Sequence, residues 1–248
     1  MKPLAQNPRE AKPLRTAGKK VRAFAFRAAA AFLFIAMADS CARPSPVLSP
    51  PPPGVDAVEG YGTASVSGGA VVKGKFSFLF RQPGLGRVEA LDPFGRTLYT
   101  MLFLGDKAYL VLASKKAYAE DRPEAVMNRF LGFSLTPDDI VRLLCGQWPP
   151  AASEPAEPGN GWILERDSGG RVVRGGRNGL SFTVAEFFRP AGVPQTVLFT
   201  RGDTAGRMKI LSLRFNPAAR PDAFDASFLR GFARKSWEEI EEIMSHED

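Results

Sequence analysis

Five short stretches in the first half of the chain have the pattern of β-strands joined by tight turns, and this pattern constrains the fold most strongly. In one of them Phe76, Phe78 and Phe80 recur at every second position, which places their rings on one face of a strand. Glycine-rich or aspartate-containing turns separate the stretches, as at residues 67–69. Consecutive hairpins of this kind predict an antiparallel meander. The predicted strands are residues 58–66, 70–81, 87–91, 96–104 and 107–112.

The strand pattern then gives way to two predicted helices. Residues 123–131 begin with proline, which is favoured in the first turn of a helix. The second helix opens at Thr136, with Pro137 next and two aspartates in its first turn, and it stops at Gly146. Apolar residues cover much of its circumference, so this helix should be buried or should lie over an apolar surface.

Strands resume after a proline-rich loop at residues 147–160, again at hairpin spacing. A meander of about ten strands curls, into either a closed barrel or a half-barrel. We therefore predict a mainly β domain: an antiparallel meander curled into an incomplete (half) β-barrel, with a helical lid inserted after about the fifth strand. Residues 225–248 predict a C-terminal helix, weakened by Gly231. The later strands are residues 162–166, 171–174, 180–187, 195–200 and 207–215.

The N-terminal segment has the composition of an export signal. Residues 1–40 hold eight basic and two acidic residues, and the apolar run at residues 28–38 is too short to span a bilayer. Two cleavage sites compete: one after Ala38, and one before Cys41, which would then carry a lipid. The proline-rich stretch at residues 43–54 favours the second, because a lipid-anchored domain needs a spacer. A disulfide between Cys41 and Cys145 is the alternative use of both cysteines.

Several classes of function are disfavoured by composition. Residues 1–40 account for six of the seven net positive charges, so the folded body is nearly neutral, unlike a nucleic-acid-binding domain. With one histidine (His246) and two cysteines, the chain offers no metal-binding cluster. We predict that the protein is not an enzyme and needs no cofactor. A catalytic role for Asp138 and Asp139 is the alternative, although helix-start residues explain them better.

The turn at residues 92–95, Asp-Pro-Phe-Gly, places a large aromatic residue at the tip of a hairpin. Hairpin tips face water, so an apolar tip requires either a packing partner or a hydrophobic target. Phe94 either folds back on its own hairpin or meets an apolar surface such as a membrane.

The order of these elements resembles the LolB outer-membrane lipoprotein receptors and their LolA-like carrier relatives. The most specific match is FLGFSLTPDDIVRLLCGQWP, residues 130–149, and the resemblance covers roughly residues 61–215. It implies a half-barrel around an apolar cavity, which accepts acylated lipoproteins from a periplasmic carrier and places them in the outer membrane. The receptors also have an exposed leucine needed for membrane delivery. The matching turn here is Pro93, Phe94 and Gly95, with Phe94 in the leucine position.

These expectations divide the chain into a signal peptide (1–40), a lipid-anchored tether (41–54), a LolB-like domain (55–216) and a helical extension (217–248). The protein would be a monomer, anchored to the outer membrane through lipidated Cys41 and facing the periplasm. The alternative is an envelope scaffold or lipid-binding protein with a packed barrel and a protein partner. The residues expected to line an acyl-chain cavity are Phe76, Phe78, Phe80, Tyr99, Met101, Phe103, Ile140, Leu144 and Phe182. A register error of one residue would invert this list.

Overall fold

A computed structural model describes residues 48–67, 72–131, 134–148, 161–220 and 222–245. The chain separates into two compact units, Met1–Ser45 and Pro46–Asp248, and the second unit carries the fold. The predicted signal peptide, Cys41 and most of the predicted tether lie outside the described residues. Within the described part, no helix is long and apolar enough to cross a membrane.

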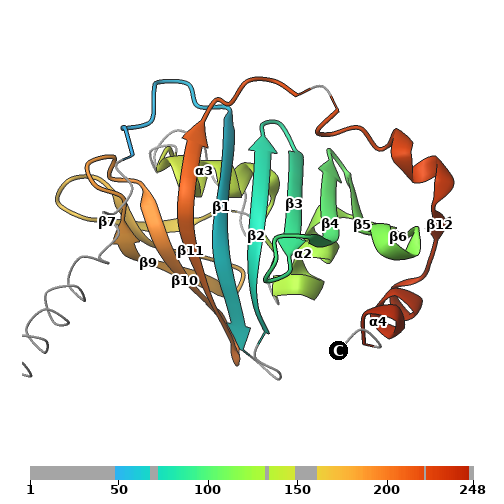
Figure 1. The fold of residues 1–248 in the computed structure, drawn as a ribbon. Helices are drawn as coiled ribbons and strands as arrows, with labels where there is room; N and C mark the ends of the chain where they lie inside the picture. The colour runs from blue at the N-terminus through green and yellow to red at the C-terminus, as the bar shows by residue number, and fades with distance from the viewer. Residues whose placement is uncertain (1–47, 68–71, 132–133, 149–160, 221, 246–248) are drawn as a thin grey trace, which may run out of the picture. The chain divides into compact units, whose positions relative to one another are not determined.

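The second unit is built on one twelve-stranded sheet with the order β12-β6-β5-β4-β3-β2-β1-β11-β10-β9-β8-β7 (Figure 1). All neighbours are antiparallel except β12, which runs parallel to β6. The prediction of a mainly β, incomplete barrel is confirmed, since the sheet is open. The strands are β1 (Ala57–Ser67), β2 (Val72–Arg81), β3 (Leu85–Leu91), β4 (Thr97–Leu104), β5 (Lys107–Leu112), β6 (Ala117–Asp121), β7 (Ile163–Arg166), β8 (Val172–Arg177), β9 (Leu180–Phe187), β10 (Pro194–Arg201), β11 (Thr204–Phe215) and β12 (Ala233–Arg234).

The sheet consists of two meanders joined through its first strand. Strands β1–β6 form one meander and β7–β11 form the other. β1 joins them by pairing with β11, from Val58 opposite Phe215 to Ser67 opposite Ala205. This pairing brings together residues more than a hundred positions apart, so no local pattern in the sequence indicates it.

Two helices, α2 (Pro123–Leu131) and α3 (Pro137–Cys145), lie behind the sheet in the view of Figure 1. They follow the sixth strand rather than the fifth. The additional strand, β6, comes after a short 3-10 helix, η2 (Ala113–Lys115), in which Lys116 adopts the left-handed conformation as the C-cap. A five-residue strand after such a break has too little alternation to be recognised from sequence.

Glycines on the neighbouring strands make room for the three phenylalanine rings of β2. The ring centroids of Phe76 and Phe78 lie 5.8 Å apart, and those of Phe78 and Phe80 lie 5.9 Å apart. A Cβ atom at Gly60 would stand 2.5 Å from the Phe78 ring. The row of rings therefore depends on the absence of side chains on the adjacent strand.

The C-terminal segment differs from the single helix that the sequence predicts. It contains a 3-10 helix, η3 (Ser227–Gly231), then β12, then α4 (Trp237–Ser245). Gly231 ends the first piece, and the backbone N–H of Glu239 bonds to the Ser236 hydroxyl at the start of α4. β12 covers the outer edge of β6, which protects that edge from pairing with other chains.

α4 completes one end of the hydrophobic core. Its residue Ile240 is fully buried. The Trp237 indole donates to Asp121 at 3.0 Å, and the Arg129 guanidinium from α2 lies 4.7 Å from the Trp237 ring centroid. An ion pair of 3.0 Å between Arg129 and Glu241 adds a second contact between α2 and α4.

The described end of the predicted tether lies along the folded unit. Leu48 forms a parallel bridge with Pro190, and the Gln147 side chain donates to the Pro52 carbonyl at 3.2 Å. Asn216 accepts from the N–H groups of Asp56 and Ala57 at 3.0 and 3.2 Å. Residues 48–57 therefore enter the fold through specific contacts.

Candidate functional site

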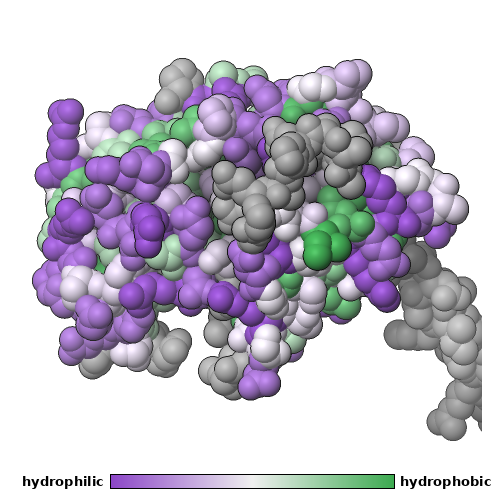
Figure 2. All heavy atoms as spheres, turned by 180° about the vertical axis from the view of Figure 1, so that it is seen from behind, coloured by the Kyte–Doolittle hydropathy of each residue, from purple (hydrophilic) through white to green (hydrophobic). Residues whose placement is uncertain are grey.

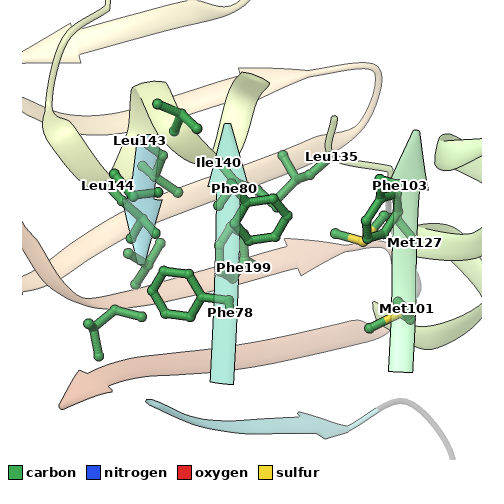
Figure 3. Close-up of a cluster of buried hydrophobic side chains, with 14 of the residues drawn as sticks. Phe78, Phe80, Met101, Phe103, Met127, Leu135, Ile140, Leu143, Leu144 and Phe199 are labelled. Atoms are coloured by element: carbon green, nitrogen blue, oxygen red, sulfur yellow. The ribbon is translucent and has the colours of Figure 1, made fainter. Parts of the chain in front are cut away.

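An apolar cavity of about 160 Å³ lies between the sheet and the two helices. Phe78 and Phe80 of β2 form one wall, and Ile140 and Leu144 of α3 lie across from them (Figure 3). Phe76 of the same strand also lines the cavity. The polar residues at its boundary are few and belong to the ends of strands. The cavity is lined by Ala64, Ser65, Val66, Gly74, Lys75, Phe76, Phe78, Phe80, Val88, Ala90, Tyr99, Met101, Met127, Leu135, Ile140, Leu143, Leu144, Phe199, Gly206, Arg207 and Met208.

Seven of the nine residues expected in an acyl-chain cavity are brought together here. They are Phe76, Phe78, Phe80, Tyr99, Met101, Ile140 and Leu144. The other two, Phe103 and Phe182, do not line the cavity. Phe103 is wholly buried against Phe80, with ring centroids 6.4 Å apart. Phe182 packs with Trp148, Trp162 and Phe199 under β7–β10. Both point to the predicted side of the sheet, but other side chains fill the space around them.

Sequence reasoning missed further lining residues. Val88 and Ala90 lie directly opposite Phe78 and Phe76 on β3, so the predicted β2–β3 hairpin register could have identified them. Phe199 and Met208 come from the second meander and reach the cavity only through the β1–β11 pairing. No sequence signal marks that contribution.

The physical character of this cavity suits an uncharged, flexible apolar ligand. Burying hydrocarbon stabilises it by about 0.8 kcal/mol per CH₂. Burial raises the pKa of Tyr99, so its hydroxyl stays neutral at physiological pH. A dry apolar cavity of about 150 Å³ holds a benzene-sized group, whereas whole-ligand pockets usually exceed about 300 Å³. The cavity as described therefore accommodates a short apolar segment, and a longer one has to extend past its rim or displace side chains.

Two aspartates fix the N-terminal end of α3 to the sheet. Asp138 accepts a hydrogen bond of 2.9 Å from the Gly84 N–H in the β2–β3 turn. Asp139 is buried and forms the capping box with Thr136. It also accepts from the Trp162 indole at 2.9 Å and pairs with Arg177 at 2.6 Å. Both carboxylates thus serve as structural acceptors, as the helix-start interpretation expects.

Arg177 completes the set of contacts that fix the N-terminal end of α3. Its guanidinium lies 4.5 Å from the centroid of the Trp162 ring, and its side chain is 19% exposed. The helix that covers the cavity is therefore held by a partly buried ion pair, an indole and a turn amide. Among the described residues, no group of three or more His, Cys, Asp or Glu residues could hold a metal ion.

The turn at residues 92–95 presents Phe94 to solvent, with 87% of its surface exposed. Asp92 organises the turn: one carboxylate oxygen accepts from the N–H groups of Phe94 and Arg96, and the other pairs with the Arg96 guanidinium at 2.6 Å. Hydrogen bonds from Arg96, its backbone N–H first, hold the pKa of Asp92 below its usual range. Gly95 supplies the positive φ of 84°. Phe94 does not fold back on its hairpin, so the turn displays an aromatic ring.

The same turn occurs a second time without an aromatic residue. Asp167 accepts from the N–H groups of Gly169 and Arg171 and pairs with the Arg171 guanidinium at 2.7 Å. Gly169 occupies the position that corresponds to Phe94. Because this turn forms equally well around a glycine, its geometry does not account for the phenylalanine.

Comparisons with known proteins place the fold. No family model and no curated protein matches the chain by sequence. A DUF1329-family protein from Desulfovibrio piger superimposes with a TM-score of 0.52 at 12% identity, over 71% of this chain and 92% of its own. A LolA-superfamily protein from Nitrosomonas europaea gives a TM-score of 0.50 at 9% identity, with the same coverage. The protein has a LolA-like fold.

At these identities the comparison establishes the fold alone. The fold expected from the sequence resemblance is therefore confirmed, whereas membership of the LolA and LolB superfamily and the narrower assignment to LolB-type receptors do not follow from it. On the side of the molecule opposite to Figure 1, a small group of hydrophobic residues lies within a largely hydrophilic surface (Figure 2). The cavity and the Phe94 turn are the two features of the structure that bear on function.

Proposed function

We propose that this protein binds the acyl chains of lipoproteins in its apolar cavity and helps to insert them into the outer membrane. The observation that supports this proposal most directly is a cavity lined by aromatic and aliphatic side chains, next to a turn that exposes Phe94. The LolA-like fold, shared with a LolA-superfamily protein, supports a lipoprotein-carrier role. The partners would be acylated lipoproteins and a periplasmic carrier, and the protein would act as a monomer.

The transfer step requires no catalytic residue. A cavity of modest size buries only part of an acyl chain. Its affinity for that chain therefore stays close to the affinity of a membrane or of a receiving protein for it. Transfer can then proceed in the direction of the deeper apolar environment. A turn that carries an exposed aromatic ring provides the contact with that environment, because phenylalanine partitions into the boundary between headgroups and acyl chains.

Filling the cavity should weaken acyl binding strongly. We expect Ala90→Phe, which adds a ring opposite Phe76, to weaken binding of a fluorescent acyl probe at least tenfold, because the added volume occupies the ligand space. Fatty-acid displacement of the probe measures this effect. The control is Ala185→Phe, at an exposed position of β9 outside the cavity. If the unmodified protein binds no probe, the packed scaffold with a protein partner becomes the better explanation.

We further propose that Cys41 becomes the lipidated N-terminal residue, so that the protein faces the periplasm from the outer membrane. The support is the sequence before Cys41 and the proline-rich spacer after it. Mass spectrometry of the mature protein from membranes should show an acylated N-terminal cysteine. A free N-terminus at Asp39 would contradict the anchor.

A further inference from the structure

Four basic residues gather on the outer face of the sheet, the face opposite the cavity helices. In β1, Ser65 pairs with one basic residue on each side, and Thr63, two residues earlier, pairs with the other two. Lys73 and Arg207 flank Ser65, while Lys75 and Lys209 flank Thr63. All four alternate with inward-facing residues such as Phe76 and Met208. We call them the basic groove: Lys73, Lys75, Arg207 and Lys209.

The charge of the basic groove is largely uncompensated. Lys209 lies 3.3 Å from Glu186. Lys73, Lys75 and Arg207 form no ion pair with another residue in the described ranges. Hydrogen bonds from Thr196 and Lys209 hold the pKa of Glu186 low, and the charge of Arg207 also acts on that carboxyl and helps to lower its pKa. Elsewhere on the same face the cations have acidic partners: Arg87 pairs with Glu89 at 2.7 Å, and Arg214 and Arg220 share Glu59. The positive excess is therefore a local property of one end of the sheet.

This arrangement concentrates positive charge in a small area. Residues that flank β1 on both sides are about 10 Å apart, since neighbouring strands are spaced by about 4.8 Å. That separation exceeds the Debye length of about 8 Å at physiological salt, so the repulsion across β1 is largely screened there and grows as salt is lowered. The repulsion is relieved when an anion or an anionic surface lies across the groove.

The basic groove adjoins both parts of the proposed functional site. It has a volume of about 590 Å³, and Leu91 and Pro93 complete its wall. Pro93 directly precedes Phe94, so the aromatic tip stands beside the cations. The groove also shares Ala64, Ser65, Gly74, Lys75 and Arg207 with the lining of the apolar cavity. Cations, an exposed aromatic ring and the cavity rim thus converge at one end of the molecule.

We propose that the basic groove binds the phosphate headgroups of anionic phospholipids at the membrane surface that Phe94 enters. Lysine ammonium groups attract such a surface as point charges, and the guanidinium of Arg207 can hold a phosphate by two hydrogen bonds. The inference adds a headgroup preference to the proposed membrane-delivery step, and it rests on that step for the contact between Phe94 and a membrane.

Sedimentation of the full chain with phospholipid vesicles tests this inference. Binding should be much stronger to vesicles of phosphatidylcholine with phosphatidylglycerol than to phosphatidylcholine alone, and it should weaken as salt is raised. Each basic residue near such a surface contributes about fivefold to binding. The triple variant Lys73→Ser, Lys75→Ser, Arg207→Ser should therefore bind anionic vesicles about 100-fold less tightly.

A second triple variant removes the same charge from elsewhere. This control carries Lys116→Ser, Arg142→Ser and Arg189→Ser, at three exposed positions outside the groove. It should keep most of the binding to anionic vesicles. Thermal unfolding verifies that both variants fold. An equal loss in the two triples, or unchanged binding by the groove variant, would overturn the inference. Displacement from the vesicles by soluble glycerophosphate at constant ionic strength would also overturn it, since the groove would then be a small-anion site.

Failure of this inference can be separated from failure of the proposed function. Binding of an uncharged apolar probe reports on the cavity alone. It is measured in the double variant Lys73→Ser, Lys209→Ser, because these two residues belong to the groove but do not line the cavity, and this variant should leave probe binding unchanged. If the unmodified protein binds the probe but shows no preference for anionic vesicles, the headgroup inference is wrong and acyl binding stands. If the protein prefers anionic vesicles but binds no probe, the cavity function is wrong and the groove assignment stands.

Discussion

Asp139→Ala is expected to lower the free energy of unfolding by about 3–5 kcal/mol, because it leaves the partly buried Arg177 without its partner. The substitution also removes the capping box with Thr136 and the acceptor of the Trp162 indole. For a domain of this size the midpoint of thermal unfolding should fall by about 2–4 °C per kcal/mol. Urea unfolding measures the loss, and Trp162 emission should change because its indole loses this hydrogen bond.

Two further variants separate the ion pair from other contributions. Asp138→Ala removes one hydrogen bond, to the Gly84 N–H, and should cost only about 1 kcal/mol. Adding Arg177→Met to Asp139→Ala should restore part of the lost stability, because the unpaired charge is then gone. If Asp139→Ala and Asp138→Ala cost the same, the anchor of α3 does not depend on the ion pair.

Phe94→Glu is expected to slow delivery of acyl chains to membranes strongly while leaving the fold intact. With 87% of its surface exposed, Phe94 contributes little to stability, so the free energy of unfolding should change by less than about 0.5 kcal/mol. Inserting a phenylalanine side chain into an apolar phase is worth about 1.5–3 kcal/mol, which corresponds to a reduction in transfer of at least about tenfold. The assay is transfer of an acylated peptide from loaded protein to phosphatidylcholine vesicles, whose zero net charge keeps the basic groove out of the measurement.

Matched variants make the result specific to the turn. Ile163→Glu removes another apolar side chain that is 82% exposed, on β7, and should leave transfer unchanged. Phe94→Leu should preserve transfer, because leucine is also an apolar interfacial residue. Equal transfer defects in Phe94→Glu and Ile163→Glu would count against a special role for this turn, as would loss of acyl-probe binding in Phe94→Glu.

The sequence indicated the local elements and several of their ends. The alternation of Phe76, Phe78 and Phe80 placed these rings on one face of β2, where the structure has them beside the cavity. Thr136 and Gly146 marked the ends of α3, and both cap it. These features depend on backbone geometry within a few residues, so a single chain segment contains the information. The C-terminal helix was predicted too long, since the pattern of one segment does not show that β12 pairs with β6.

Packing between distant segments decided which residues line the candidate site. Phe103 and Phe182 have the same inward alternation as Phe76, yet neighbouring side chains fill the space around them. Phe199 and Met208 reach the cavity because β1 pairs with β11. Strand periodicity shows which side chains point inward. Whether a cavity remains beside them depends on all the neighbouring side chains together.

The sequence by itself determined a mainly β chain with a helical insertion and an aromatic hairpin tip. Only the tertiary structure placed β2 and β11 on either side of β1, and this arrangement assembles the basic groove. Only the tertiary structure brought Arg177 to Asp139, and this ion pair anchors α3. Local propensity and alternation act over a few residues, and they set the first group of features. The second group depends on which distant strands become neighbours, because the free energy of those contacts belongs to the whole sheet.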